Sequence, residues 1–519
     1  MQNELVVELV RSVRANHRSD RPFTWQACSA NGETLSVKAF PAEDHVLPTG
    51  SDAFILPSLV GRLDTMLRAP GDHRPLVLEV ALDGPAAQFH HSFELTSLTP
   101  CSVLLDPEFR YPNHYRGATP RPSAAQPSTL PTDPRVRRHV RSLVDEFTTY
   151  YRRVKGRAPQ FGPPCPAADL VAAEAALGVR FPDDVRALYE LVGDDRYETG
   201  LLGRYSLLPL PLIVAGRTTP ARNTPDNRVV FEAHPPDTVR RVSHSDWWVT
   251  VATDGAGGEC AVDLDPAPGG TYGQFIESGH GVTGRTVTAE SATALLMRVV
   301  DALRRNDIDP RYANSGYLGI RTPEPPAVWW STSIRVDERD LTELLAARPN
   351  VEQVQQLYLN DAAAPDLRAL SATPLLRELI VHRAGRVELR LPDTVESVRV
   401  HARAVELSAV AAHPALWDVT VTGCPVRVER LAALPALLRL DVSGADVDDV
   451  PALADLDLRV LVLDAEQWAR LWAADRVPER LAVAECVGDV TLPQLAEWAA
   501  WLRGKVDNAV KAVAPQGNT

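Results

Sequence analysis

The stretch LVAAEAALGVRFPDDVRALYELVG, residues 170–193, determines the prediction for the middle of this 519-residue chain. Gly178 ends a first short helix, because glycine tolerates the left-handed backbone at a helix C-terminus. Pro182 opens a second helix, since proline is accepted in the first helical turn, and Gly193 closes it. Apolar residues recur at helical spacing in both halves, at Leu170, Leu177, Val185, Leu188, Tyr189 and Val192.

A second segment, WWVTVATDGAGGECAVDLDPAPGGTYGQFIESGHG at residues 247–281, has the pattern of β-structure. Three short apolar runs are separated by Gly-rich and Pro-rich turns, which is typical of antiparallel strands. Amphipathic helices flank the region, one starting at Arg135 and one spanning Thr288 to Asn306. We therefore predict an α+β domain over residues 135–306, with helices packed on an antiparallel sheet.

The two short helices carry the pattern E-x-x-LG-x-x-(F/L)P-x-x-h-x-x-h-Y, in which h is apolar. This pattern resembles the start of the SUKH superfamily, which includes the yeast cell-wall-assembly regulator family and many bacterial immunity proteins. The segments at 200–210, 254–266 and 273–276 also fall where that family places its strands. Val192-Gly193 departs from the family, which more often has Asn-Gly there. The matching residues are Glu174, Leu177, Gly178, Phe181, Pro182 and Tyr189.

Residues 1–117 predict a separate small α+β domain with an antiparallel sheet. The order is helix, hairpin, helix, hairpin, and the hairpin turns fall at Asn31-Gly32 and Asp83-Gly84. This order faintly resembles YezG-like immunity or antitoxin domains. Residues 118–134 are rich in Pro, Ser, Thr and Ala without an apolar period, so we expect a linker.

A repeat of about 21 residues runs through residues 351–490, within the range of leucine-rich repeats. Each copy predicts a short parallel strand, and the array resembles a divergent leucine-rich-repeat solenoid. Residues 307–350 are expected to connect, and residues 491–519 to form a capping helix and tail. The aligned copies are Val354-x-x-Leu357-x-Leu359, Leu376-x-x-Leu379-x-Val381, Val395-x-x-Val398-x-Val400, Leu416-x-x-Val419-x-Val421, Leu437-x-x-Leu440-x-Val442, Leu458-x-x-Leu461-x-Leu463 and, more weakly, Leu481-x-Val483.

The net charge of −13 argues against general binding of nucleic acid or anionic membranes, which needs a basic surface. It suits a basic protein partner, although simple solubility explains it equally well. The six cysteines include no C-x-x-C pair, so neither a zinc cluster nor a redox pair is predicted. The N-terminus lacks a secretory pattern, and no run approaches about 18 apolar residues, so we expect a cytoplasmic chain without a membrane span.

No catalytic constellation stands out, and neither cofactor nor metal is implied. The loop Asp254–Gly258 could cradle a phosphate, but it lacks a following helix and a lysine, which favours a hairpin turn. Asp263 and Asp265 share a strand face and could serve acid–base chemistry or bind calcium. The family resemblance carries no catalytic residues here, and no nucleophile, base and orienting group can be named together. We therefore expect a protein that is not an enzyme.

The resemblance implies an immunity or antitoxin-type protein that neutralises a toxin, such as a basic nuclease, by stoichiometric binding. The alternative is a cytoplasmic scaffold or regulator of cell-wall or signalling proteins. Acidic residues of the repeat could form a patch for the partner or only a solvated rim, and the tryptophans could be anchors or core. The candidate partner-binding residues are Trp247, Trp248, Asp254, Glu259, Asp263, Tyr272, Asp446, Asp448 and Asp449.

Overall fold

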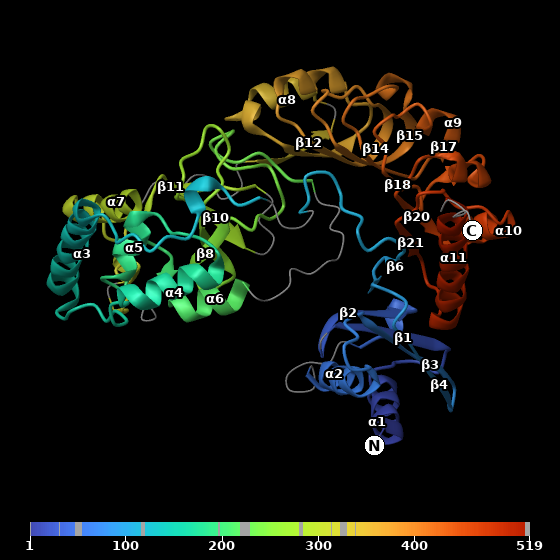
Figure 1. The fold of residues 1–519 in the computed structure, drawn as a ribbon. Helices are drawn as coiled ribbons and strands as arrows, with labels where there is room; N and C mark the ends of the chain where they lie inside the picture. Colours follow the sequence, from blue (N-terminus) through green and yellow to red (C-terminus); the bar gives the residue numbers. More distant parts are fainter. Residues whose placement is uncertain are drawn as a thin grey trace, which may run out of the picture. The chain divides into compact units, whose positions relative to one another are not determined.

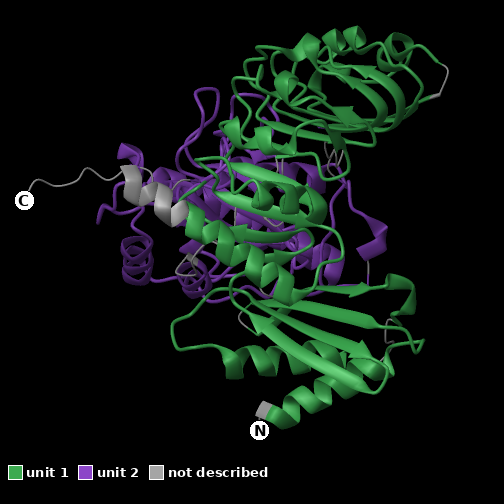
Figure 2. Cartoon of the chain, turned by 90° about the vertical axis from the view of Figure 1, so that its right-hand side faces the viewer, with its two compact units in different colours: residues 1–109, 331–519 green, residues 110–330 purple. Residues whose placement is uncertain are grey.

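The computed structural model describes residues 2–30, 32–46, 54–115, 120–195, 198–217, 229–279, 284–312, 314–321, 330–337 and 339–513. The chain forms two compact units, one made of residues 1–109 and 331–519 and the other of residues 110–330 (Figure 2). Both units mix helices with sheets, so the protein is multi-domain, as predicted. Residue 281, where the second quoted segment ends, and residues 514–519 of the expected tail lie outside the described residues.

The N-terminal part of the first unit is a four-stranded antiparallel sheet in the order β2-β1-β3-β4. Helices α1 and α2 cover one of its faces (Figure 1). The predicted order of helix, hairpin, helix and hairpin is confirmed. Strand β1 is buried along almost its whole length, because it is a central strand whose side chains enter two hydrophobic cores. The elements are α1 (Gln2–Ala15), β1 (Phe23–Ala30), β2 (Glu33–Phe40), α2 (Ile55–Leu67), β3 (Leu76–Asp83) and β4 (Ala86–Ser92).

The C-terminal part of this unit is a row of eight parallel strands that follow one another in sequence order (Figure 1). The first of them, β12, lies in the segment 307–350 that the sequence assigns to a connector. Short helices join the strands, among them α8 (Leu341–Ala346), α9 (Val428–Leu431) and α10 (Ala465–Ala473). The strands are β12 (Ser331–Asp337), β13 (Gln356–Ala362), β14 (Glu378–Glu388), β15 (Ser397–Glu406), β16 (Asp418–Thr422), β18 (Arg439–Asp441), β20 (Val460–Asp464) and β21 (Val483–Val487).

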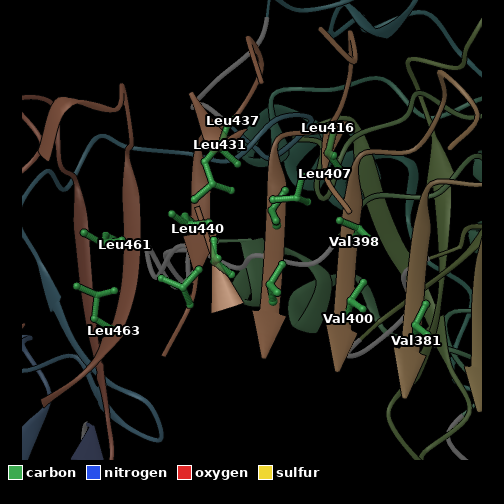
Figure 3. Close-up of a cluster of buried hydrophobic side chains, with 14 of the residues drawn as sticks. Val381, Val398, Val400, Leu407, Leu416, Leu431, Leu437, Leu440, Leu461 and Leu463 are labelled. Carbon is green, nitrogen blue, oxygen red and sulfur yellow. The ribbon is translucent and has the colours of Figure 1, made fainter. Parts of the chain in front are cut away.

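The register of this sheet places the aligned apolar positions of the repeat side by side. Leu357 pairs with Leu379, and the same row continues through Val398, Val419, Leu440 and Leu461. These side chains are buried and stack into one continuous core, part of which Figure 3 shows. Burying an aliphatic side chain contributes about 1.5–3 kcal/mol, so the regular period of the sequence is the direct cause of the regular stack.

The N-terminal sheet is joined to the end of this array. The hairpin of β5 (Ser97–Leu98) and β6 (Cys101–Leu104) pairs antiparallel with β21, which extends the parallel sheet to ten strands. Helix α11 (Leu492–Val513) covers the array end, and its first amide N–H, at Leu492, donates to the buried Glu79 carboxylate at 2.5 Å. The sequence prediction treated residues 1–117 as a separate domain and did not anticipate this joint.

The second unit holds a five-stranded antiparallel sheet in the order β11-β10-β9-β8-β7, with helices packed around one core. None of the described helices of the chain is both long and apolar enough to cross a membrane. The elements are α3 (Pro134–Lys155), α4 (Ala167–Leu177), α5 (Asp183–Tyr189), β7 (Ser206–Leu207), α6 (Leu210–Arg217), β8 (Trp248–Thr253), β9 (Gly258–Asp263), β10 (Gln274–Gly279), β11 (Val287–Ala289) and α7 (Ala292–Arg304).

The described part of the predicted linker, residues 120–133, packs on this core. Ala125 is fully buried, and its carbonyl oxygen accepts the Arg180 N–H at 2.9 Å. Thr132 is also buried, and its hydroxyl oxygen accepts a bond from the Arg186 guanidinium at 3.2 Å. Residues 120–133, here called the strap, are therefore held on the core although their composition is typical of linkers. The cause is that a few of their small and polar side chains have specific partners.

Candidate functional site

The Gly-rich loop at residues 254–258 is a hairpin turn between β8 and β9. The Asp254 carboxylate accepts the N–H groups of Ala256 and Gly258, each at 2.8 Å. Gly255 and Gly257 adopt positive φ, which only glycine takes without strain. The turn interpretation is confirmed: the acidic side chain occupies the N–H groups that a phosphate would need.

Asp263 is fully buried and takes part in the packing of the sheet. Its carboxylate accepts the Asp265 N–H at 3.0 Å and the Gln274 amide N–H at 2.9 Å. Burial raises the pKa of Asp263 to about 6. The neighbouring candidate Glu259 is half-buried and accepts the Thr250 hydroxyl at 3.0 Å. Asp263 is thus held inside the fold, without the open face that acid–base work on a substrate requires.

Trp247 and Trp248 lie in the core, which was the alternative interpretation of this pair. Trp247 belongs to the main core of the second unit, while Trp248 packs in a smaller cluster beside it. The Arg285 guanidinium lies 5.1 Å from the Trp248 ring centroid. Both side chains are less than a tenth exposed, so neither presents an anchor surface in this conformation.

Tyr272 links the strap to the segment between α4 and α5 and does not face a cleft. Its hydroxyl lies 3.0 Å from the Ala124 carbonyl oxygen and 3.1 Å from that of Arg180. Burial raises the pKa of Tyr272 to about 12, so the hydroxyl keeps its proton and remains a donor. Tyr272 therefore helps to hold the fold of the second unit.

A buried ion pair explains the residue pattern of the two short helices. Glu174 of α4 pairs with Arg186 of α5, and both side chains are almost fully buried. Glu174 also accepts the Phe181 N–H at 2.8 Å, which fixes the turn between the helices. The family pattern of the sequence includes Glu174 but not Arg186. The signal for Arg186 was its position inside an otherwise apolar helical stretch.

Gly193 has a different role from the one predicted. Helix α5 ends at Tyr189, so Gly193 does not close it. A Cβ atom at Gly193 would lie 2.0 Å from the Pro163 carbonyl oxygen. The residue is glycine because two backbone segments meet there, a contact between distant parts of the chain that local pattern cannot predict.

The acidic candidates of the repeat, Asp446, Asp448 and Asp449, are exposed in the first unit. Asp446 starts the short strand β19 (Asp446–Val447), and Asp448 accepts the Val428 N–H at 3.1 Å. Asp449 caps the following helical turn by accepting the Ala452 N–H. Three further acids of the later repeats are paired with arginines, so part of the predicted patch is neutralised locally: Asp455 with Arg476, Asp457 with Arg480 and Glu466 with Arg470.

Two adjoining cavities open beside the first strands of the array, and no sequence motif pointed to them. They are about 450 and 550 Å³ in volume, and both are lined by Asp361 and Arg383. Among the described residues, no group of three or more His, Cys, Asp or Glu side chains is arranged to hold a metal ion. The linings of both cavities include arginines.

The sequence that forms the α4–α5 pair and the antiparallel sheet was compared with known families. Residues 164–298 match the SMI1 / KNR4 family (SUKH-1). The chain is also 25% identical over 206 residues to the cell wall assembly regulator SMI1 of Saccharomyces cerevisiae, an alignment that takes in 30% of this chain and 40% of the yeast protein. The chain thus spans less than half the length of this curated relative. The SUKH-1 domain lies within the predicted boundaries of 135–306.

Proposed function

We propose that the chain is a non-enzymatic, cytoplasmic protein-binding protein of the immunity type, which neutralises a basic toxin such as a nuclease by stoichiometric binding. The observation that carries the proposal is the SUKH-1 domain at residues 164–298, since this family acts through protein binding. We further propose that the parallel array is a divergent leucine-rich-repeat solenoid, a second surface of the kind used for protein partners.

The state of the candidate carboxylates in the SUKH-1 domain supports a binding role. Asp254 stabilises its own turn, and Asp263 is buried in hydrogen bonds to the chain itself. Glu259 bonds to a neighbouring strand. A catalytic acid or base must reach a proton on a substrate, whereas these groups are engaged in holding the fold.

Charge provides the proposed mode of recognition. Asp446, Asp448 and Asp449 are exposed at neighbouring positions of the array, and the whole chain carries a net charge of −13. Opposite charges steer association and raise its rate, an effect that weakens as salt is added. A basic nuclease would thus approach the acidic end of the array, where its cationic surface would be covered.

The test is co-expression of the chain with a candidate nuclease toxin from the same organism, followed by measurement of Kd between the purified proteins. The triple variant D446N/D448N/D449N removes three charges while keeping side chains that can still cap backbone N–H groups. A matched control, D145N/E352Q/D393N, changes three exposed acids elsewhere. The proposal predicts that the unmodified chain rescues the cells. It also predicts that D446N/D448N/D449N binds the toxin more weakly, whereas the control variant binds it as tightly as the unmodified chain.

Loss of rescue by the unmodified chain would overturn the immunity function. If the chain rescues the cells and both triple variants bind equally well, the immunity function stands and the acidic contact is wrong. Separating these outcomes matters because the domain and the acidic residues lie in different units of the protein.

The second candidate is a regulator or scaffold for cell-wall or signalling proteins. The similarity to the yeast cell wall assembly regulator favours it. Deletion of the gene distinguishes the two functions, because a regulator predicts altered sensitivity to cell-wall stress in cells that contain no toxin. An immunity protein predicts a phenotype only when the toxin is present.

A further inference from the structure

The two cavities at the start of the array are lined by arginines from the repeats of β12, β14 and β15. Their described linings contain five arginines and one carboxylate, that of Asp361. This local excess of positive charge contrasts with the net negative charge of the chain. The arginines are Arg335, Arg339 and Arg348 in the first cavity, Arg403 in the second, and Arg383 in both.

Asp361 positions two of these arginines. Arg383 binds it through two nitrogens, Nε to Oδ1 at 2.6 Å and Nη2 to Oδ2 at 3.1 Å, and Arg335 Nη2 lies 3.0 Å from Oδ2. The Arg383 hydrogen bond lowers the pKa of Asp361, so the carboxylate stays charged. The two arginine side chains remain 68% and 69% exposed. A guanidinium has five N–H donors, and Arg383 uses only two on Asp361.

The backbone at the cavity wall adopts an uncommon conformation. Asp361 and Arg383 have φ values of 56° and 54°, in the left-handed region that non-glycine residues rarely adopt. The pairing of β14 with β15 shifts register between Val381 and Ala384, which is the bulge that contains Arg383. Such residues cost about 1–2 kcal/mol, and they concentrate at functional sites because a site can require their geometry.

Two further arginines extend the positive surface. Arg348 is exposed, and its guanidinium donates to the Ser333 carbonyl oxygen at 3.2 Å. Arg403 is exposed and makes neither an ion pair nor a hydrogen bond with any residue in the described ranges. An exposed guanidinium without a carboxylate partner is a strong donor for an external carboxylate or phosphate.

We propose that these cavities bind an acidic segment of a protein partner, with its carboxylates on the row of arginines. The row spans β12 to β15, three strand steps of about 4.8 Å or about 14 Å in all, which equals about four residues of extended chain. A single small anion would use only one end of the row. A long phosphate backbone would be repelled by the acids of the later repeats. The inference goes beyond the proposed function, which uses those later repeats.

The test is fluorescence polarisation of the full chain with a labelled hexaglutamate peptide at low salt, with hexaglutamine as the neutral peptide. Binding of hexaglutamate should weaken by about tenfold or more in R348Q/R403Q, because two charge-assisted contacts are lost. R383Q should also weaken the binding of hexaglutamate. Because this variant is independent of R348Q/R403Q, weaker binding in both would not be explained by a folding defect in one of them. The control R476Q/R480Q removes two exposed arginines at the acidic end and should change Kd less than about twofold.

Three results would overturn the proposal. The first is equal binding of hexaglutamate and hexaglutamine, and the second is unchanged hexaglutamate affinity in both R348Q/R403Q and R383Q. The third is tighter binding of a six-phosphate oligonucleotide with the same arginine dependence, which would assign the site to nucleic acid. Failure of toxin neutralisation would leave this result unaffected, because the peptide assay contains no toxin.

Discussion

Replacing Arg186 by Met tests the buried ion pair that organises the SUKH-1 domain. The change leaves the Glu174 carboxylate buried, with the Phe181 N–H at 2.8 Å as a remaining donor. Removing one partner of a buried pair costs about 3–5 kcal/mol, because the other charge stays uncompensated. Glu174→Gln should cost less, since Arg186 keeps bonds to Thr132 at 3.2 Å and to the Leu130 carbonyl oxygen at 3.3 Å.

The double variant E174Q/R186M should recover most of the loss. It carries no buried charge at the site, and the amide oxygen of the substituted side chain can still accept the Phe181 N–H. Hydrogen exchange of the full chain, followed in peptides from residues 167–193, measures local opening. R186M should raise exchange there by roughly a hundred- to several-thousand-fold, since each factor of ten corresponds to about 1.4 kcal/mol. Peptides of β20 and β21 are the internal control.

A change in R186M below about fivefold would refute the reasoning, because the pair would then contribute little to the fold. The reasoning would also be refuted if the free-energy loss of the double variant equalled the sum of the losses of the two single variants. That result would mean that the two residues act independently despite their contact.

Three further predictions concern titration, accessibility and the joint of the first unit. Because the pKa of Asp263 is raised to about 6, the folded chain keeps a proton between about pH 4 and 6 that the unfolded chain releases, and stability falls as pH rises through this window. By pH 7 the free energy of unfolding has fallen by about 3 kcal/mol. Urea unfolding of D263N should lack this pH dependence. An equal dependence of the free energy of unfolding on pH in D263N would contradict the assignment to Asp263. Cys165 is the one cysteine of the six that is not buried, so the native chain should show a single fast-reacting thiol that C165S removes, and a second fast thiol would argue against the packing. E79Q removes a negative charge from the N-terminus of α11, where Glu79 accepts the Leu492 N–H; exchange in α11 should report a loss of about 1–2 kcal/mol, whereas unchanged exchange would show that the charge is dispensable.

Local pattern predicted the parts of the fold in which burial repeats regularly. The array is one case, because Leu357, Leu379 and their counterparts return at fixed steps, and the register confirms the alignment. The pairing of β6 with β21 is the opposite case. In this backbone pairing Cys101 lies opposite Cys486, so the two strands are far apart in the sequence. Edge strands carry no local signal for such a distant partner. Strand β12 was missed because it lacks the leucines of the later copies.

The candidate site was predicted less well, for physical reasons. Sequence shows which residues are charged or aromatic but not whether they are buried, so Trp247 and Asp263 were among the candidate partner-binding residues although both are buried. The arginine-lined cavities were missed because their members are spread from Arg335 to Arg403 and share no motif. They meet because parallel pairing sets β12, β13, β14 and β15 side by side, although the arginines occupy different positions along the strands and the segments between them.

The net charge of the chain does not describe the first repeats of the array. The strand β14, which carries Arg383, and the strand β20, which ends in Asp464, are four strand steps apart, or about 19 Å. The Debye length at physiological ionic strength is about 8 Å, so exposed charges at one end are largely screened from the other. A ligand at the first repeats therefore meets arginines even though the chain as a whole is acidic. A total of −13 therefore argues against anionic ligands only at surfaces where the acids are within reach, and not at the cavities beside Asp361.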